Sequence, residues 1–412
     1  MRFTTLCIRY AFTALALTVH TGTAFAEGTE TKTLSAWEEA LRASKPILDA
    51  VIRYEHVAQD GIAENADALT YRIRAGVETG KLWETSLLIE FDHVQDLAGD
   101  FNSTINGKTV FPIVADPNAT EINRFQLTNT SLPETRITLG RQRIILDNAR
   151  FIGNVGWRQN EQTFDALRVE NTSIKGLTLD AAYIDQVNRI FGDDSPAGRW
   201  ESDSWLVNGR YDLPLKGAQA SIGGFSYLLD FENAAAASSQ TFGVHASLAR
   251  GFLSLKGAYA AQSDYGAQTV DYNADYYMVE GGVAKGGFSA GVGYEVLTGD
   301  GVVGFSTPLA TLHAFNGWAD VFLATPADGL KDVYGSLGYK KKHVGPFSLV
   351  NFTAAYHDFS AEATDADYGS EVDLLAVGKI NRFTVLAKAV FYNTDGFATE
   401  REKFWLQLAF AL

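Results

Sequence analysis

The sequence predicts an all-β protein: a transmembrane antiparallel β-barrel of about 18 strands, with short periplasmic turns and long extracellular loops. Three observations predict this fold: apolar and polar residues alternate along most of the chain, the connections are alternately short and long, and the last stretch is amphipathic. In that last stretch one strand face carries Phe404, Leu406, Leu408, Phe410 and Leu412. Such a strand is typical of a barrel whose last strand closes against its first. A half-buried strand of a soluble β-sandwich is the alternative.

The first residues predict export. Arg2 and Arg9 flank a short apolar run, and Ala24-Phe25-Ala26 matches the small-x-small pattern that signal peptidase recognises. Residues 1–26 are therefore a predicted signal peptide, and no later stretch is apolar for long enough to form a membrane helix. The only cysteine, Cys7, lies in this peptide, so the sequence predicts a mature fold without disulfides.

Composition excludes one class of partner. The formal net charge is −15, and removal of Arg2 and Arg9 makes it −15 − 2 = −17, which argues against nucleic acid. The mean hydropathy is near zero although 46% of residues are hydrophobic, as alternating strands require. The acidic residues cluster in stretches that we expect to be loops, where solvation explains them.

Residues 27–46 are mostly polar and are predicted to be a periplasmic N-terminal segment. Ser35 followed by Glu38 fits a capping box and predicts a short helix there. From Ile47 the period changes to two, so the barrel is predicted to span residues 47–412.

The alternation is clearest near the start of this region. Apolar Tyr71, Ile73 and Val77 alternate with charged Arg72 and Arg74. The same period returns in later stretches, for example 225–231, 242–248, 253–259, 288–296, 333–339 and 385–391. Each predicted strand thus has one apolar and one polar face, as the wall of a large membrane barrel does.

The connections take two lengths in turn. Tight ones are predicted at 80–81, 132–133, 175–176, 216–217, 250–251, 285–287, 344–346 and 381–382, and longer polar ones lie between them. Counting Gly299–Gly329 as one loop leaves an even number of strands and places both chain ends in the periplasm. Two tandem soluble β domains remain the alternative, although nothing in the sequence resembles a linker.

The loop Gly299–Gly329 is far longer than a hairpin needs and is unusually apolar. A solvated loop would not keep residues such as Leu309, Leu312 and Phe322 exposed. We expect it to fold into the barrel as a constriction loop whose candidate site residues are His313, Asn316, Trp318 and Asp320.

Two long blocks carry a family resemblance. One runs from Gly140-Arg141-Gln142-Arg143 to Phe151-Ile152-Gly153 and continues to Asp165-Ala166; the other runs from Thr307-Pro308 through His313 to Asp320 and ends at Gly329-Leu330-Lys331-Asp332. Together they resemble the alginate-export family of bacterial outer-membrane β-barrel proteins. The resemblance implies an outer-membrane location, export of anionic polysaccharide through a pore of basic residues, and periplasmic export partners.

Arginines are dense in the first third of the mature chain. The candidate pore and substrate-binding residues are Arg53, Arg72, Arg74, Arg124, Arg141, Arg143, Arg150 and Arg158. As lumen residues they would present guanidinium groups that bind carboxylates, which predicts mild selectivity for anions. The alternative is that the last four pair with Asp147, Glu161 and Asp165 and only hold a loop to the wall.

The sequence gives little support for catalysis. His313, Asp320 and Ser306 could suggest a hydrolytic triad, but no Gly-x-Ser-x-Gly elbow accompanies them. No pattern for a metal site, a phosphate loop or another cofactor site is present. The sequence therefore predicts a channel that is not an enzyme, lies in outer-membrane lipid and passes anionic polysaccharide or small anionic solutes. The rival functions are a barrel hydrolase and a structural or adhesin barrel.

Overall fold

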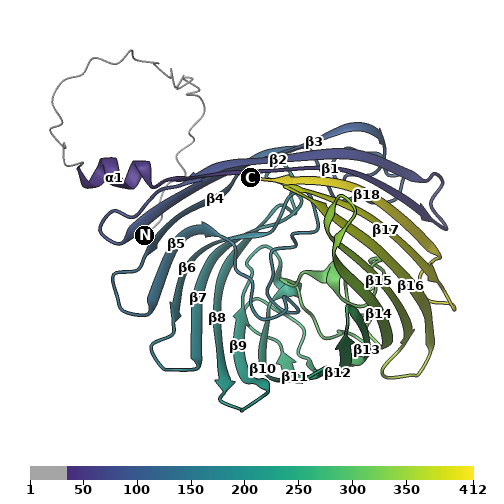
Figure 1. Ribbon diagram of the computed structural model, residues 1–412. Helices are drawn as coiled ribbons and strands as arrows, with labels where there is room; N and C mark the ends of the chain where they lie inside the picture. The colour runs from purple at the N-terminus through teal and green to yellow at the C-terminus, as the bar shows by residue number, and fades with distance from the viewer. Residues whose placement is uncertain (1–34) are drawn as a thin grey trace. The chain divides into compact units, whose positions relative to one another are not determined.

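The computed structural model describes residues 35–412, which form one helix, two short 3-10 turns and eighteen strands (Figure 1). The predicted signal peptide, residues 1–26, lies outside the described residues. The elements are α1 (Ala36–Arg42), β1 (Lys45–Gln59), β2 (Ala66–Glu78), β3 (Thr85–Asp100), β4 (Ala119–Asn129), β5 (Thr135–Gln142), β6 (Thr163–Asn171), β7 (Leu177–Asn188), β8 (Arg199–Leu213), β9 (Gln219–Leu229), η1 (Ala235–Ala237), β10 (Ser239–Arg250), β11 (Leu253–Ser263), β12 (Asn273–Lys285), β13 (Phe288–Leu297), η2 (Leu312–Ala314), β14 (Leu330–Val344), β15 (Phe347–Ser360), β16 (Asp367–Ile380), β17 (Phe383–Asn393) and β18 (Arg401–Ala411).

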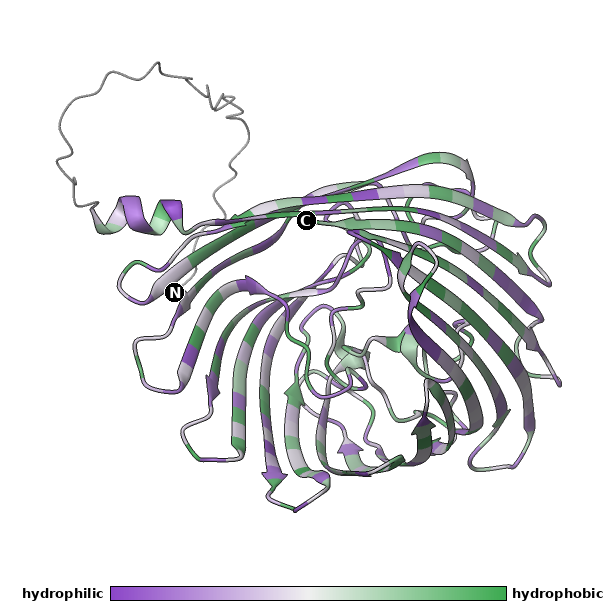
Figure 2. Cartoon of the chain, viewed as in Figure 1, coloured by the Kyte–Doolittle hydropathy of each residue, from purple (hydrophilic) through white to green (hydrophobic). Residues whose placement is uncertain are grey.

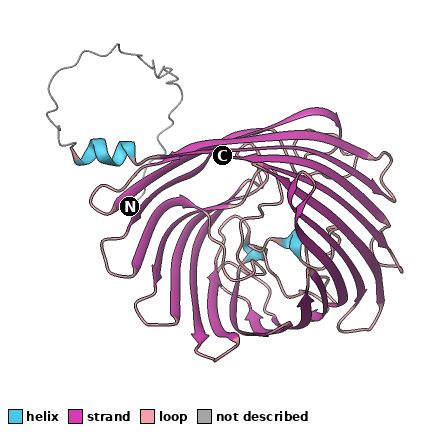
Figure 3. Cartoon of the chain, viewed as in Figure 1, coloured by secondary structure: helices cyan, strands magenta, loops and turns pink. Residues whose placement is uncertain are grey.

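The strands form a single closed antiparallel sheet (Figure 3). Each strand pairs with its neighbours in sequence, and β1 pairs with both β2 and β18. The closing register runs from Asp49 opposite Ala411 to Gln59 opposite Arg401. The predicted closed all-β barrel is therefore confirmed. The two alternatives, a soluble β-sandwich and two tandem β domains, are wrong.

Hydrophobic and hydrophilic residues alternate along the strands (Figure 2), and the large apolar side chains of the strands are exposed on the outer face. In β18, Phe404 and Leu406 are exposed, whereas Lys403 and Trp405, which alternate with them, are buried and contact Asp320 and Trp157 of the inward loops. Successive side chains of a strand point to opposite faces of the sheet. Because the buried residues of β18 face the interior, the exposed apolar residues that alternate with them face outward. An apolar exterior around a closed sheet suits lipid, because every backbone polar group of the wall is paired within the sheet.

The N-terminal part of the described chain begins with α1. The first strand starts at Lys45, two residues before the barrel boundary predicted at residue 47. Within residues 35–412 no helix is long and apolar enough to cross a membrane.

From β3 onward long and short connections alternate, whereas the first two, 60–65 and 79–84, are equal in length. Four of the short ones have only two residues, namely 251–252, 286–287, 345–346 and 381–382. In one of them Gly286 and Gly287 have φ of 61° and 89°, the left-handed conformation that a two-residue hairpin turn of this type requires. The longest connection, 298–329, is a single loop between β13 and β14, as predicted.

The interior is filled by side chains from long loops and from the wall. A buried apolar cluster joins Ile152, Phe305 and Leu309 of the loops to Phe225 and Tyr276 of the wall. A smaller cluster packs Phe101 and Val114 of the loop 101–118 against β1 and β2. These contacts place three long loops inside the barrel.

The outward face should tolerate charge according to its depth in the lipid. Val279 lies at the centre of β12 and is 58% exposed, so Val279→Arg should cost about 2–4 kcal/mol of folding free energy. Leu253, the first residue of β11 next to a two-residue turn, is the matched control: Leu253→Arg should cost about 0–1 kcal/mol. Urea unfolding in phospholipid vesicles measures both. Equal costs at the two depths would contradict a lipid-facing wall.

Candidate functional site

Three loops meet inside the barrel: 101–118, 143–162 and 298–329. The second and third form a short parallel bridge, in which the amide of Gly153 donates to the carbonyl of Leu309 at 2.8 Å and that of Thr311 donates to Ala149 at 3.0 Å. The amide of Gln159 donates to Asp116 Oδ1 of the first loop at 2.8 Å. The loops thus form one hydrogen-bonded unit rather than three independent segments.

The loop 298–329, predicted to be a constriction loop, is attached to the wall by Glu371 of β16, two strands beyond β14. The Glu371 carboxylate accepts hydrogen bonds from the amides of Trp318 and, at 2.8 Å, Ala319. Gly317 makes this approach possible, because its φ is 81° and a Cβ would lie 2.4 Å from Glu371 Oε2. Asn316 donates to Glu295 Oε2 of β13 at 2.6 Å.

The arginines of the first strands lie on the lumen face and are paired. Arg53 of β1 donates to Gln407 Oε1 at 3.0 and 2.6 Å, and its Nη1 is 3.8 Å from Asp116. Arg74 of β2 donates to Asp92 Oδ2 at 2.9 and 2.8 Å. Its neighbour Arg72 pairs with Asp49 of β1.

A second group of arginines surrounds two glutamates. Arg124 of β4 donates to both oxygens of Glu90 at 2.9 and 2.7 Å. Arg143 donates to Glu161 Oε1 at 2.6 Å and is 3.3 Å from Glu90. Burial opposes ionisation of Glu161, but Arg74 at 3.4 Å and Arg143 outweigh it and lower the pKa of this carboxyl to about 2. Glu161 therefore stays ionised at any physiological pH.

The remaining predicted arginines join distant parts of the chain. Arg141 forms a two-pronged pair with Asp165 at 2.8 and 3.0 Å. Arg150 donates to Glu295 at 2.8 Å and to Asn316 at 3.1 Å. Arg158 donates to Glu55 of β1 at 3.0 Å. The sequence offered the alternative that these arginines pair with Asp147, Glu161 and Asp165. The pairs Arg141–Asp165 and Arg143–Glu161 are present, whereas Asp147 accepts a hydrogen bond from Asn208.

Arg53, Arg72, Arg74 and Arg124 lie on the lumen face and Arg143, Arg150 and Arg158 on the inward loop 143–162, whereas Arg141 of β5 lies in register with the outward Phe125. Each of the eight has at least one carboxylate within ion-pair distance. Arg124, Arg141 and Arg143 keep part of their surface exposed, whereas Arg53, Arg72, Arg74, Arg150 and Arg158 are buried. Most of the arginines are therefore neutralised by carboxylates, and several of these ion pairs hold the loops to the wall. Their role as pore and substrate-binding residues stays a prediction.

A second cluster is centred on His313. Its Nδ1 is 2.6 Å from Asp320 Oδ1, and its Nε2 is 2.6 Å from Lys388 Nζ of β17. Lys403 of β18 donates to Asp320 Oδ2 at 2.5 Å. The indole of Trp157 stacks on the imidazole with a centroid distance of 4.7 Å and an interplanar angle of 9°. Lys388 lies 3.7 Å from the ring centroid of Trp318.

The protonation states follow from burial and neighbours. The pKa of His313 is lowered to about 3. Burial is the main cause; Asp320 opposes it, and Lys388 adds to it. The ring is therefore neutral, with Nδ1–H donating to Asp320 and Nε2 accepting from the ammonium of Lys388. Burial opposes ionisation of Asp320, but His313 and Lys403 prevail and hold the pKa of this carboxyl well below its usual value.

This geometry does not build the hydrolytic triad considered from the sequence. The second imidazole nitrogen faces Lys388 and not a hydroxyl, and the backbone amide of Ser306 donates to Gln262 at 2.7 Å in another part of the lumen. Among residues 35–412 no group of three or more potential ligand side chains could hold a metal ion.

A cavity of about 610 Å³ opens beside the His313 cluster, between the long loops. Its walls are largely apolar, with Phe111, Ile113, Phe191, Leu312 and Leu323 among them. Its charged lining consists of Arg158, Arg189, Arg401, Lys403 and Asp320.

Two cations of this cavity lack a carboxylate partner in the described part of the chain. Arg189 lies 3.9 Å from the ring centroid of Trp200, its Nε is buried without a hydrogen bond, and burial lowers its pKa to about 10. Arg401 donates from Nη1 to the carbonyls of Ala319 and Asp320 at 2.9 and 3.1 Å, and its Nε has no partner.

The sequence did not single out Arg189, Lys388, Arg401 or Lys403. We expected the later strands to carry basic residues mainly at turns, yet Lys388 and Lys403 are buried on the lumen face of β17 and β18. The alternation along each strand could have revealed both lysines. Lys388 follows the outward Ala387, and Lys403 precedes the outward Phe404, so each lysine lies on the lumen face of its strand. Arg189 and Arg401 flank strand ends, where no periodicity marks them.

A closed antiparallel barrel with an apolar exterior and a charged, loop-filled interior defines an outer-membrane β-barrel. Solved structures agree with this class. The chain is similar to Pseudomonas aeruginosa OccK9 (OpdG), with 16% identity, a TM-score of 0.68, and coverage of 91% of this chain and 100% of that one. It is also similar to Acinetobacter baumannii OccAB4, with 12% identity, a TM-score of 0.69, and coverage of 90% of this chain and 98% of that one. For Pseudomonas aeruginosa OpdK the identity is 14%, the TM-score is 0.67, and the coverage is 89% of this chain and 98% of that one.

These likenesses establish the fold, and they confirm the expected bacterial outer-membrane barrel. That the protein is not an enzyme stays a prediction, because likenesses at 12–16% identity show the fold alone. Scans against known protein families and curated proteins find no match. The resemblance to alginate exporters therefore receives no support, because the similar solved structures belong to another group of barrels.

Asp320 should be essential for seating the constriction loop. Asp320→Asn leaves Lys403 buried without its counter-charge, and breaking a buried pair in this way costs about 3–5 kcal/mol. Limited proteolysis of the folded protein should then cut within 298–329 much faster than in the wild type. Asp328→Asn, in the same loop but without a side-chain ion pair in the described chain, is the control and should change nothing.

Acid should loosen the same loop through His313. The seated ring has a pKa of about 3, whereas a released ring returns to its ordinary value of 6.5. The released state therefore binds more protons between these values, and the seated state loses stability as the pH falls from 6.5 towards 3. Single-channel recordings should show more frequent conductance steps at pH 4 than at pH 7. His313→Gln should remove this pH dependence, and an unchanged dependence would contradict the assignment.

Proposed function

We propose that the protein is an outer-membrane diffusion channel for small anionic solutes that carry an apolar body. The observation that carries this proposal is the cavity between the long loops, which combines apolar walls with Arg189 and Arg401, two cations without carboxylate partners. A guanidinium without a counter-charge next to a stacked indole suits a carboxylate attached to an aromatic or aliphatic group.

The orientation of the barrel belongs to the same proposal. The short turns would face the periplasm and the long loops the outside, as in other outer-membrane barrels. The cavity then lies on the external side of the constriction formed by loops 143–162 and 298–329. A solute would meet the unpaired arginines before it meets the neutralised network in the lumen.

The paired arginines would act differently from a bare basic ring. Their carboxylate partners balance most of the charge, so the lumen would select through the few partly exposed guanidinium groups, those of Arg124 and Arg143. A low-dielectric pore focuses even a modest excess of positive charge, which is compatible with mild anion preference in a protein of net charge −15.

Small solutes fit the interior better than a polymer does. Three loops occupy the lumen and are tied to the wall by buried ion pairs, so a polysaccharide chain would have to displace them. Among the similar structures, Pseudomonas aeruginosa OpdK was solved with vanillate, which is a small carboxylate. This favours the small-solute branch of the sequence-based expectation over polysaccharide export and over partners in an export machine.

The test is ion and solute selectivity in planar bilayers. Reversal potentials across a KCl gradient should show mild anion preference, and benzoate should permeate faster than benzylammonium. Combining Arg189→Gln with Arg401→Gln should lower benzoate flux by roughly tenfold, the lower end of what field focusing contributes. Arg199→Gln, which removes an exposed arginine paired with Asp193, is the control. Cation preference in the wild type, or an unchanged flux in the double variant, would contradict the proposal.

A further inference from the structure

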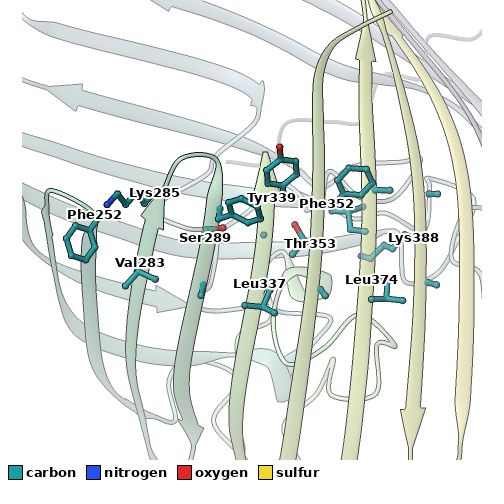
Figure 4. A pocket seen from close by; sticks show the side chains of 18 of the residues that line it. Phe252, Val283, Lys285, Ser289, Leu337, Tyr339, Phe352, Thr353, Leu374 and Lys388 are labelled. Atoms are coloured by element: carbon teal, nitrogen blue, oxygen red, sulfur yellow. The ribbon is translucent and has the colours of Figure 1, made fainter. Parts of the chain in front are cut away.

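A further cavity lies on the outer wall and not in the lumen. It has a volume of about 930 Å³ and extends across β12 to β18 (Figure 4). Its lining includes Val283, Phe288, Leu337, Phe352, Leu374 and Phe404, all of which are exposed on the outward face. We call this depression the outer groove.

Strand register explains why the wall is hollow there. One outward row runs Val283, Ala290, Leu337, Ala354, Leu374, Ala389, Phe404 across successive strands. In the adjacent row, the pair Ala376–Ala387 follows Phe288, Tyr339 and Phe352. Alanines between large side chains leave a depression whose floor is the sheet itself. In a bilayer an apolar depression of this size must be covered.

The end of the groove nearest the short turns carries positive charge. Lys285 lines the groove, and Lys341 follows Tyr339 by two positions, so it faces outward on the same strand. The exposed cations around these turns, which we call the basic rim, are Arg250, Lys285, Lys340, Lys341, Lys342, Lys379 and Arg382. In Figure 4, Lys285, Tyr339 and Phe352 lie at one end of the groove, and Val283, Leu337 and Leu374 lie farther along it.

No acidic residue balances the basic rim. The segments 249–254, 283–288, 339–348 and 378–383 contain neither Asp nor Glu, and in the described chain no rim cation has an ion-pair partner. Short turns elsewhere differ: Lys81 is 3.1 Å from Glu84 in the turn 79–84. In the described chain, two other short turns each hold one unpaired lysine, Lys175 in 172–176 and Lys216 in 214–218, whereas the seven unpaired cations of the basic rim are gathered in the turns beside the groove.

We propose that the outer groove and the basic rim form a binding site for an anionic phospholipid. An acyl chain lies over the alanines, the aromatic row of Phe288, Tyr339 and Phe352 sits at the level of the interface, and Lys285 and Lys341 bind the phosphate and the anionic headgroup. A second copy of the chain fits less well, because an axis along the membrane normal would bring two basic rims to the same level, where they repel.

This site goes beyond the proposed channel function and does not depend on it. The groove lies outside the lumen, so a barrel that fails to conduct anions could still bind lipid, and a conducting barrel could fail to bind it. The two proposals are therefore tested by separate measurements.

Native mass spectrometry of the folded, delipidated protein tests the site with two probes of equal acyl composition, dioleoyl phosphatidylglycerol and dioleoyl phosphatidylcholine. The wild type should retain phosphatidylglycerol preferentially. Combining Lys285→Gln with Lys341→Gln should weaken its binding roughly thirtyfold, as expected for two basic residues at an anionic lipid surface, and should leave phosphatidylcholine unaffected. Ala354→Trp, which fills the groove on its lipid-facing side, should weaken binding of both lipids.

The matched control combines Lys175→Gln with Lys216→Gln, which removes two exposed lysines from short turns on the other side of the barrel and should change nothing. Equal retention of the two lipids by the wild type, or undiminished phosphatidylglycerol binding by the Lys285 and Lys341 double variant, would overturn the proposal. Lipid-free dimers that Ala354→Trp abolishes would also overturn it, because a second copy would then occupy the groove.

Discussion

Closure of the sheet between β1 and β18 is the constraint on which the rest of the structure depends. Lipid offers no hydrogen bonds to a strand edge, so a sheet can lie in a bilayer only when its first and last strands pair. The eleven-residue register from Asp49 opposite Ala411 to Gln59 opposite Arg401 provides that pairing. Because the wall is then a closed ring, its polar face encloses a lumen, and any loop that folds inward meets charged side chains on every side.

The lumen is organised by charge balance and not by an excess of one sign. Arginines of β2 and β4 face glutamates and aspartates on neighbouring strands, and the inward loops bring further partners. A buried charge is tolerated only when it is paired, so each of these contacts both neutralises the wall and fixes a loop. Arg189 and Arg401 stand apart, because the described chain gives neither of them a carboxylate within ion-pair distance, and both line the cavity beside His313.

The outer face follows a different rule. Most outward positions carry apolar side chains, but the sizes of these side chains vary, and the register places alanines of several strands in the same two rows. The hollow that results meets the part of the barrel end where lysines are unpaired. The inner face therefore holds paired charges around the inward loops. The outer face has a depression where alanines lie between large side chains, and unpaired lysines lie at one end of that depression.

The sequence by itself determined the period of two, the faces of the strands, the positions of the short turns and the single long loop after β13. These are local properties: side-chain direction alternates along any strand, and glycine pairs such as Gly286-Gly287 mark turns through their backbone freedom alone. It also identified the arginines, since they occupy polar positions. Only the tertiary structure decided their partners, because Arg158 meets Glu55 and Arg150 meets Glu295 across more than a hundred residues. The buried lysines of the His313 cluster and the outer groove likewise depend on which residues closure and register bring side by side, which no local pattern encodes.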